Sequence, residues 1–563
     1  MTETKLDETT ADPSDPYLRR AQTFPKLNAD QLERAKRFGT VETLAKGTVL
    51  FERGDRTVDF FIVLRGNIEI YESQREGPNL LTALGEHRFT GETDLFNDRP
   101  ALVNGRMGED GCIIRIARPA FRKLLSAEPD LGEIIMRAFI LRRVGLISHE
   151  QGSVTLIGSH SFPDMLRIER FLRRNGYPVR VLDVDRTAEA RQMLDDLGMP
   201  EGDCVVLCPF QQAIRNPSNA ELAACLGLAE EIDPEDVYDV AVVGAGPSGL
   251  AAGVYAASEG LKTIILEAEA PGGQAGTSSK IENYLGFPTG ISGQALAGRA
   301  QIQAQKFGAR IALPRTVVNV RCEGLPYVLQ LQDGGEVRAQ AIVIASGARY
   351  RGIDLANCAA FEGAGIHYAA TGMEAALCAD EDVIVVGGGN SAGQAAVFLS
   401  RQARHVTILV RSRGLAASMS DYLVGRIEAS RKITLLTQTE ITALEGGRHL
   451  ERVTWTNRAT GASETRDIRH VFLMIGARPN TEWLDGCIQL DEKGFVRTGP
   501  AVAQDDWPLE RAPFLLETSR PGILAVGDVR TDSVKRVASA VGEGSVSVQL
   551  VHQVLAEQRA GAA

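Results

Sequence analysis

The stretch Val240-Ala-Val-Val-Gly-Ala-Gly-Pro-Ser-Gly-Leu250 determines the fold of the C-terminal half of this chain. Its first four residues form a buried-strand run that leads directly into a glycine loop and then into the helical run 250–260. A second strand, 263–266, follows and ends at Glu267. This order predicts a β-α-β unit that carries the G-x-G-x-x-G fingerprint of a dinucleotide site.

Each residue of this loop has an expected physical role. Gly244 permits the tight turn, Gly246 lets a pyrophosphate approach the backbone, and Gly249 lets the helix pack closely on the strand. The diphosphate is expected at the helix N-terminus, beside Ser248, where free N–H groups favour an anion. Glu267 stands about 20 residues further on, where a carboxylate bonds the ribose hydroxyls.

The unit recurs about 140 residues later. A strand at 382–386 leads into a second glycine loop, a helix that runs to about residue 401, and another strand at 406–410. Alanine replaces the third fingerprint glycine, which is an allowed variant. The residues expected to bind the second cofactor are Gly387, Gly389, Asn390, Ser391 and Ala392.

The second unit has no acid at the end of its second strand. Arg411 and Arg413 stand there instead. An adenosine 2′-phosphate needs positive charge at this point and would be repelled by a carboxylate. The pattern therefore favours NADPH over NADH, although two arginines on a solvated loop remain the alternative.

The length, net charge and cysteine content of the chain argue against several classes of protein. The chain has 563 residues with a formal net charge of −11, which argues against a general binder of nucleic acid or anionic membranes. The sequence contains no apolar run of 18 residues and no signal-like start, which predicts a cytoplasmic protein. Its eight cysteines form no C-x-x-C and no zinc-ligand spacing, so we expect free thiols and no metal site.

The N-terminal half divides into smaller parts. Residues 1–24 are predicted to be a disordered arm, and glycine-punctuated strands followed by a helical stretch predict a β-barrel or roll over 25–150. A β-α-β-α-β order over 153–228 predicts a small α/β domain. An acidic linker, 229–236, comes before the glycine loops. The expected fold class is multidomain α/β, ending in two Rossmann-type dinucleotide-binding domains.

Residues 238–558 resemble low-molecular-weight thioredoxin reductases. The resemblance lies in the segments 271–274, 281–283, 345–349, 475–480, 526–528 and 535–538. It implies an FAD domain made of 237–350 plus 470–563, an NAD(P)H domain at 351–469, and a homodimer. Beyond the first loop, the residues that it implies for FAD are Gly273, Gln274, Asn283, Ala345, Gly347, Gly527, Asp528, Val537 and Ala538.

The catalytic dithiol of that family is missing. Ala369 and Gly372 occupy the two cysteine positions, and a dithiol relay needs two thiolates. Cys358 and Cys378 flank the region, so a pair between them is conceivable, but two buried thiols are favoured. His367, beside the vacated positions, is interpreted as a core histidine.

Residues 25–145 resemble a cyclic nucleotide-binding domain, whose phosphate cassette is similar to residues 89–101. Gly91 and Glu92 are the ligand residues that this resemblance implies. Ala101 stands where the cassette arginine normally pairs with the cyclic phosphate, and Arg99 and Arg106 are out of register. A cyclic nucleotide, a different ligand and a docking role therefore all stay open.

Residues 153–228 resemble a glutaredoxin-like thioredoxin fold. Ser161 to Asp164 stand where its C-x-x-C would open the first helix, which predicts a redox-inactive module. Cys204 and Cys208 are interpreted as strand thiols, because residues at i and i+4 on a strand lie ~13 Å apart. That distance is too long for a disulfide between them.

Together these features predict an FAD-dependent NAD(P)H oxidoreductase without a dithiol. Hydride is expected to pass from the nicotinamide to the flavin, and the electrons then leave to a quinone, a ferredoxin-like protein, oxygen or a small molecule. The cofactors carry the chemistry, so no catalytic acid or base is assigned. Two alternatives remain: a flavin- or nucleotide-responsive sensor, and a thioredoxin reductase that uses remote cysteines.

Overall fold

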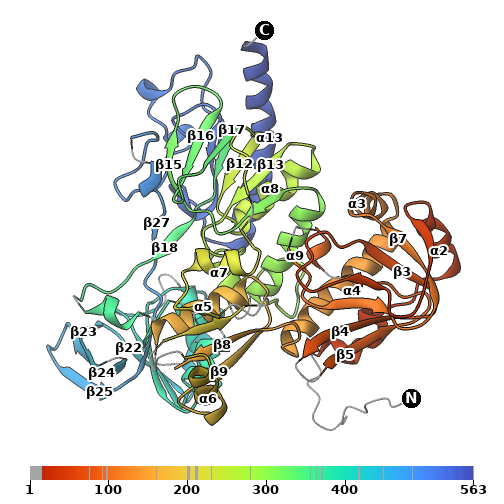
Figure 1. Ribbon diagram of the computed structural model, residues 1–563. Coiled ribbons are helices and arrows are strands. Elements are labelled where there is room, and N and C mark those ends of the chain that lie inside the picture. The colour runs from red at the N-terminus through yellow and green to blue at the C-terminus, as the bar shows by residue number, and fades with distance from the viewer. Residues whose placement is uncertain are drawn as a thin grey trace. The chain divides into compact units, whose positions relative to one another are not determined.

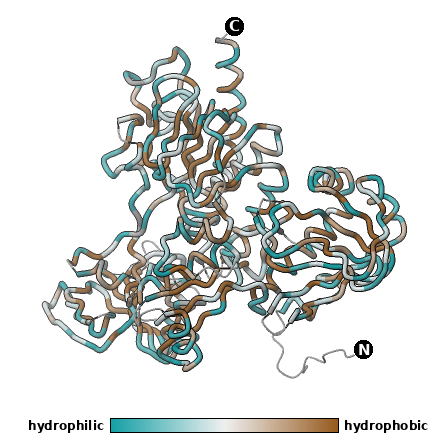
Figure 2. The backbone as a smooth tube through the Cα atoms, in the orientation of Figure 1, coloured by the Kyte–Doolittle hydropathy of each residue, from teal (hydrophilic) through white to brown (hydrophobic). Residues whose placement is uncertain are grey.

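The computed structural model describes residues 15–561 apart from 75–76, 92, 97–98, 160–161, 199–202, 209–212, 230, 279–280, 356, 363, 369, 371, 416–418, 448 and 485. The chain divides into two compact units, whose helices and strands are labelled in Figure 1. The first comprises Met1–Gly158 and Ile168–Glu230, and the second comprises Ser159–Arg167 and Glu231–Ala563. Figure 2 shows that hydrophobic residues concentrate along the strands of the sheets.

After a short helix, α2 (Ala29–Lys36), the first unit forms an antiparallel roll of two sheets, as predicted. One sheet has the order β1-β7-β3 and the other the order β2-β6-β4-β5. Two helices follow, α3 (Arg118–Ala127) and α4 (Pro129–Ser148). The strands are β1 (Thr40–Leu44), β2 (Val49–Phe51), β3 (Phe60–Arg65), β4 (Ile68–Gln74), β5 (Gly77–Leu84), β6 (Asn104–Met107) and β7 (Gly111–Ile116).

Residues 16–23 correct the expectation of a disordered arm over 1–24. They form a 3-10 turn, η1 (Pro16–Arg19), and a helical turn, α1 (Arg20–Thr23). Thr23 is fully buried; its hydroxyl donates to the Pro16 carbonyl at 2.6 Å, and its own carbonyl accepts from Arg142 Nε at 2.9 Å. Helix α4 thus holds this segment in place. The polar sequence of the segment gives no sign of this contact. Residues 1–14 lie outside the described part of the chain.

The small α/β domain has the predicted β-α-β-α-β order, extended by a hairpin strand and a helix. Strand β8 pairs in parallel with β9 and antiparallel with β10, and β11 lies at the edge. Helix α7 (Asn219–Cys225) follows the hairpin. The other elements are β8 (Val154–Gly158), α5 (Pro163–Arg174), β9 (Val179–Asp183), α6 (Ala188–Asp196), β10 (Val205–Leu207) and β11 (Ala213–Arg215).

The second unit contains two sheets of Rossmann type, as predicted. The first is centred on β12 (Val237–Val243), whose alternate residues enter two cores: Ala241 and Val243 face one, and Val240 and Val242 face the other. Burial on both faces is typical of a central parallel strand. The strand order of this sheet is β14-β13-β12-β17-β16-β15, with β28 paired to β17. These strands are β13 (Thr263–Leu266), β14 (Arg310–Ala312), β15 (Val317–Arg321), β16 (Tyr327–Leu331), β17 (Glu336–Ile344) and β28 (Ile523–Ala525).

Three helices accompany this sheet: α8 (Pro247–Ser258), α9 (Gly293–Lys306) and α13 (Val537–Gly561). Helix α13 packs along α8 (Figure 1). The C-terminal helix therefore buttresses the helix that opens at the first glycine loop.

The second Rossmann-type sheet lies in the inserted segment and has the order β19-β26-β20-β21-β22, all parallel. Two short antiparallel strands, β18 (Ala348–Tyr350) and β27 (Ala477–Pro479), form the crossing into and out of the insertion. The sheet strands are β19 (Ile366–His367), β20 (Asp382–Val386), β21 (His405–Leu409), β22 (Ile433–Leu436) and β26 (His470–Leu473). The insertion also contains α10 (Gly372–Leu377), α11 (Asn390–Leu399), α12 (Asp421–Glu428), β23 (Thr439–Gly446), β24 (Leu450–Asn457) and β25 (Ser463–Asp467).

Four cysteines contradict the expectation of free thiols. Cys208 pairs with Cys225, and Cys322 pairs with Cys487, each with a Cα–Cα distance of 6.2 Å. Strand spacing excludes only a bond between Cys204 and Cys208, and Cys204 takes part in neither of these two disulfides. The actual partner of Cys208 ends helix α7, which strand spacing cannot anticipate. Among the described residues, no helix is long and apolar enough to cross a membrane.

Candidate dinucleotide and ligand sites

The first glycine loop has the close packing that its fingerprint predicts. Gly244 has φ +105°, and a Cβ added there would collide with the carbonyl oxygen of Ala345. A Cβ at Gly249 would collide with the carbonyl oxygen of Gly244. Gly246, at the N-cap of α8, is different: the nearest atom to an added Cβ is Gly273 Cα, 3.9 Å away. The loop is therefore tight against the protein at Gly244 and Gly249 and open at Gly246, as a cradle for a diphosphate requires.

Glu267 lies at the end of β13, beside this loop. Its carboxylate accepts a hydrogen bond from the backbone N–H of Ala245 at 2.8 Å and another from Glu269 at 2.9 Å. These two bonds hold an acidic side chain at the loop, in the position where a ribose acceptor is expected.

Two motifs distant in sequence close around the loop. Gly273 lies against Gly246, because a Cβ added to Gly273 would stand 3.0 Å from Gly246 Cα. Gln274 follows, and its amide donates to the carbonyl of Ala348 at the crossing strand. Ala345 bonds through its N–H to Val243 at 2.8 Å, and the Gly347 carbonyl accepts from Asn480 at 3.0 Å.

The C-terminal motif also reaches the first loop. A Cβ added at Gly527 would stand 2.7 Å from the hydroxyl oxygen of Ser248, which is 5% exposed. Asp528 follows in the 3-10 turn η8 (Gly527–Val529). Burial raises the pKa of Asp528, the negative charge of Glu543 adds to the rise, and Lys535 opposes it.

Three of the expected FAD residues are less enclosed. Asn283 lies on an exposed turn, and Val537 and Ala538 form the first turn of α13. Ten others are brought into one cluster around the first loop: Gly244, Gly246, Ser248, Gly249, Glu267, Gly273, Gln274, Ala345, Gly347 and Gly527. Asp528 directly follows Gly527 of this cluster in the chain.

Glu543 is a site residue that the sequence reasoning missed. Its carboxylate accepts from the Gly527 N–H at 2.7 Å and pairs with Arg530 at 2.7 Å. It therefore fixes the turn that presents Asp528. A glutamate within a long helix gives no local signal of this role, because the role depends on how α13 packs.

The second glycine loop repeats the same geometry. Gly387 has φ +141°, and a Cβ there would collide with the Met474 carbonyl oxygen. Gly389 caps α11, and Ala392 is fully buried beneath the loop. Asn390 and Ser391 are exposed at the first turn of the helix, and Asn390 Oδ1 accepts from the Ser420 N–H at 2.8 Å.

Arg411 and Arg413 follow β21 and are both exposed. Within the part of the chain that the structure describes, neither forms an ion pair with a carboxylate. Two guanidinium groups are thus available at the end of the second strand, where a 2′-phosphate requires positive charge.

The thiols near the vacated dithiol positions lie on opposite sides of a sheet. Cys378 packs in one core with Val383 and Val385, whereas Cys358 packs in another with Ile384 and Val386. Because these valines and isoleucine alternate along β20, the sheet separates the two sulfurs. Burial raises the pKa of Cys378 to about 12 and also raises that of Cys358. Neither is poised as a thiolate nucleophile.

His367 is a buried histidine of the same sheet. It is 2% exposed, its ring stacks on Phe472, and its Nε2 lies 3.1 Å from Nδ1 of His470. These contacts agree with its interpretation as a core residue. At the expected cysteine positions, Gly372 begins α10, and Ala369 lies outside the described residues.

In the N-terminal roll, Ala101 stands where the phosphate cassette normally has an arginine. The two candidate substitutes have other partners: Arg99 donates to the Asn175 carbonyl at 2.9 Å, and Arg106 pairs with Glu69 at 2.8 Å. Gly91 has φ +96°, and its carbonyl accepts from Arg142 at 2.9 Å. Glu92, the other expected ligand residue, lies outside the described residues.

The disulfide of the small α/β domain lies toward the amino end of β8. Val205 of β10 pairs with Ile157 near the carboxyl end of β8, so Cys208 lies toward the opposite end of that strand. The C-x-x-C position follows the carboxyl end of β8. Ser161 lies outside the described residues.

Comparison with known proteins agrees with this geometry. The family described as pyridine nucleotide-disulphide oxidoreductase matches residues 238–544, and the cyclic nucleotide-binding domain family matches residues 41–128. A thioredoxin reductase of Mycolicibacterium smegmatis is 33% identical over 324 residues, which are 58% of this chain and 98% of that protein. One from Bacillus subtilis is 31% identical over 325 residues, covering 57% of this chain and 96% of that protein.

Solved structures give the same result. The FR conformation of Lactococcus lactis thioredoxin reductase matches with a TM-score of 0.51 and 27% identity, covering 57% of this chain and 99% of that one. The T. acidophilum thioredoxin reductase matches with the same TM-score, identity and coverage. The chain therefore belongs to the pyridine nucleotide-disulphide oxidoreductase family, as a thioredoxin reductase-like, FAD-containing and NAD(P)H-dependent oxidoreductase with an N-terminal cyclic nucleotide-binding domain.

Proposed function

We propose that this enzyme passes electrons from NADPH through FAD to an acceptor other than its own dithiol. The observation that carries the proposal is the separation of Cys358 and Cys378 by the β20 sheet, together with Ala369 and Gly372 at the family's cysteine positions. Within this insertion, no pair of thiols can take part in a dithiol relay. The acceptor classes are a quinone, a ferredoxin-like protein, oxygen or a small molecule.

The residues around the first glycine loop fit FAD. The open backbone at Gly246 would receive the diphosphate, Glu267 the ribose hydroxyls, and Asp528 the ribityl chain. When bound, the flavin and the nicotinamide together supply the two-electron redox chemistry. The protein would orient them, and Glu543 would contribute by holding the Gly527 turn in place.

The second glycine loop fits NADPH. Gly389 is the N-cap of α11, and among the described residues no side chain caps this helix, so its N-terminus would meet a diphosphate. Arg411 and Arg413 would bind the 2′-phosphate. The absence of an acid after β21 supports NADPH as the donor, and NADH remains the weaker alternative.

An acceptor screen tests the proposal. The FAD-loaded protein is mixed with NADPH under anaerobic conditions, and turnover is measured with a quinone, a ferredoxin, oxygen and a disulfide substrate such as oxidised thioredoxin. We expect multiple turnovers with at least one non-disulfide acceptor. Turnover with oxidised thioredoxin alone would contradict the proposal, and retention of that activity in the Cys358→Ser, Cys378→Ser variant would assign it to other cysteines.

We further propose that the N-terminal domain regulates the enzyme. We also propose that the protein acts as a homodimer. The observation that favours a ligand bound without the usual arginine–phosphate pair is the engagement of Arg99 and Arg106 elsewhere. Titration with cyclic AMP and cyclic GMP, followed by calorimetry and by the rate of NADPH oxidation, tests both binding and regulation. Light scattering of the purified protein tests the dimer.

A further inference from the structure

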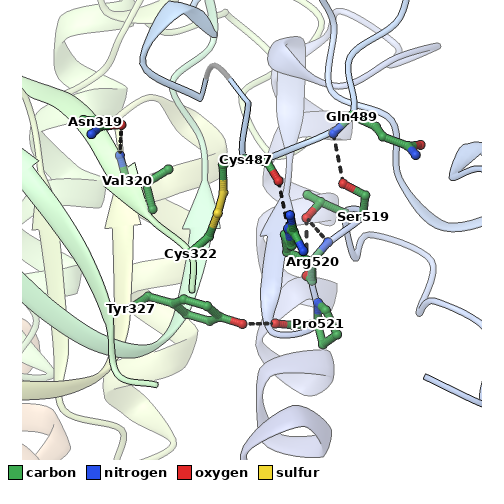
Figure 3. Close-up of a disulfide and its surroundings, with 10 residues drawn as sticks. Asn319, Val320, Cys322, Tyr327, Cys487, Gln489, Ser519, Arg520 and Pro521 are labelled. Carbon is green, nitrogen blue, oxygen red and sulfur yellow. Dashed lines mark hydrogen bonds between the residues drawn. A yellow bond between two sulfur atoms is a disulfide. The ribbon is translucent and has the colours of Figure 1, made fainter. Parts of the chain in front are cut away.

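The Cys322–Cys487 disulfide joins the two sequence segments of the FAD-binding half. Cys322 directly follows β15, and Cys487 follows the 3-10 turn η5 (Glu482–Leu484). The residues between them include the whole insertion that carries the second glycine loop. Figure 3 shows the bond reaching from the strand to the C-terminal segment, with Arg520 beside Cys487.

The segment that contains Cys487, residues 480–497, is bonded to the candidate FAD cradle at both ends. At its start, the Asn480 N–H donates to Gly347 at 3.0 Å, and the Ser346 hydroxyl donates to the Asn480 carbonyl at 2.8 Å. At its end, the Val496 N–H donates to Val529 at 3.0 Å, next to Asp528. We call residues 480–497 the latch segment.

The middle of the latch segment is held by side-chain packing and by the disulfide. Trp483, Leu484 and Ile488 enter the same core as the strands of the sheet. The disulfide is the covalent tie between this segment and β15. Opening it would leave the packing in place and remove the covalent constraint on the part of the segment that lies between its two cradle contacts.

We propose that Cys322 and Cys487 form a reversible redox site, and that its reduction by a dithiol weakens the retention of FAD. This inference rests on the proposed placement of FAD around Gly347 and Asp528. By linkage, any factor by which the bond tightens FAD binding is also the factor by which FAD stabilises the bond.

The chemistry is thiol–disulfide exchange. Cys322 is only partly buried and Cys487 is 7% exposed, so a thiolate of the dithiol attacks the Cys322 sulfur. The S–S bond breaks, a mixed disulfide forms at Cys322, and Cys487 leaves as a thiolate that takes up a proton. The second thiol of the dithiol then displaces Cys322 as a thiol, so two electrons and two protons reach the protein and the reductant becomes a disulfide.

The leaving group has a suitable surrounding. Arg520 Nε donates to the Cys487 carbonyl at 3.0 Å, which places a positive charge next to the residue whose sulfur leaves (Figure 3). A cation next to a thiolate favours its ionised form, and a better leaving thiol accelerates exchange.

The test compares FAD release from oxidised and reduced holoprotein in the absence of NADPH. The protein is equilibrated with oxidised or reduced dithiothreitol, diluted, and followed by the fluorescence of released FAD; alkylation and mass spectrometry report the state of each cysteine. We expect release to be at least about fivefold faster after reduction, within the usual range of coupling between two sites. The Cys322→Ser, Cys487→Ser variant should release FAD at the fast rate in both buffers, whereas Cys208→Ser, Cys225→Ser should respond like the wild type.

Two results would overturn the redox site. One is equal release rates although mass spectrometry shows the bond opened; the other is free thiols at Cys322 and Cys487 even in the oxidising buffer. The wild-type comparison needs no substitution, so a variant that fails to fold does not affect it. A protein that takes up FAD but shows no redox response contradicts this inference alone, whereas a protein that binds no FAD contradicts the proposed function as well.

Discussion

The two glycine loops of the second unit share a backbone design and differ in the residue that ends the second strand of each β-α-β unit. Both loops join a buried parallel strand to a helix through a glycine with positive φ, Gly244 in the first and Gly387 in the second. The first β-α-β unit ends its second strand with Glu267, held against the loop by the Ala245 N–H. The second ends with exposed arginines.

The difference shows which part of a dinucleotide site is general and which is specific. The loop and helix N-terminus serve any diphosphate, because backbone N–H groups and the helix dipole recognise only its charge. The residue after the second strand meets the ribose, so a carboxylate suits hydroxyls and a guanidinium suits a phosphate. Substitutions in the backbone loop and at the strand ends can test this division.

The largest effect is expected at the third fingerprint position. Gly249→Ala places a Cβ against the Gly244 carbonyl oxygen. Because this oxygen belongs to the backbone, it cannot move away as the end of a flexible side chain could, so we expect loss of bound FAD. Flavin content of the purified variant, by absorbance, is the measurement. The matched control is Ala392→Gly in the second loop, where the wild type already has the Cβ; this variant should keep its FAD. An FAD-replete Gly249→Ala protein would refute the role of close packing at this position.

A smaller effect is expected at the end of the second strand. The double variant Arg411→Ala, Arg413→Ala loses charge-assisted bonds worth about 1.5–3 kcal/mol, so KM for NADPH should rise about 10- to 100-fold with little change for NADH. Steady-state kinetics with both donors measure this. Arg452→Ala, which removes an exposed arginine from the β23–β25 sheet, is the control. Equal losses with both donors would mean that these arginines do not read the 2′-phosphate.

Removal of the charge at Glu267 should cost less, because glutamine keeps hydrogen-bonding atoms of the same reach. Glu267→Gln is expected to weaken FAD about fivefold, which corresponds to about 1 kcal/mol. Equilibrium titration of the apoprotein with FAD measures the change, and the affinity for NADPH serves as the internal control. A weaker NADPH affinity with unchanged FAD affinity would reverse the assignment of the two loops.

The smallest effect is expected for the thiols of the insertion. Cys358→Ser and Cys378→Ser should each leave the rate of acceptor reduction within about twofold of wild type, since the sheet separates them. Because burial raises both pKa values, the thiols stay protonated at neutral pH and become more reactive only as the pH rises toward those values. Alkylation of the native protein at pH 7 should therefore be slow at both, and fast after unfolding. Rapid alkylation in the native state would contradict this picture.

The loops could be predicted from the sequence because each is a local pattern. A strand, a glycine turn, a helix and a second strand lie within about 30 residues, and the alternation of burial along β12 follows from its run of apolar residues. Glu543 and the Cys208–Cys225 disulfide could not be predicted, because each depends on how a helix packs against the segment before it. The Cys322–Cys487 disulfide could not be predicted, because its cysteines are 165 residues apart in the chain. The order of Thr23 and its neighbours could not be predicted either, because the contact that holds them comes from Arg142, more than 100 residues away.

Two dinucleotide cradles in one chain, one for FAD and one for its electron donor, are the basis of the proposed electron transfer. Anaerobic addition of NADPH to the FAD-loaded protein tests this pairing of cofactors without any substitution. We expect rapid loss of the visible flavin absorbance with NADPH, and slower or weaker loss with NADH. A protein that takes up no FAD, or whose flavin stays oxidised under excess NADPH, would contradict it.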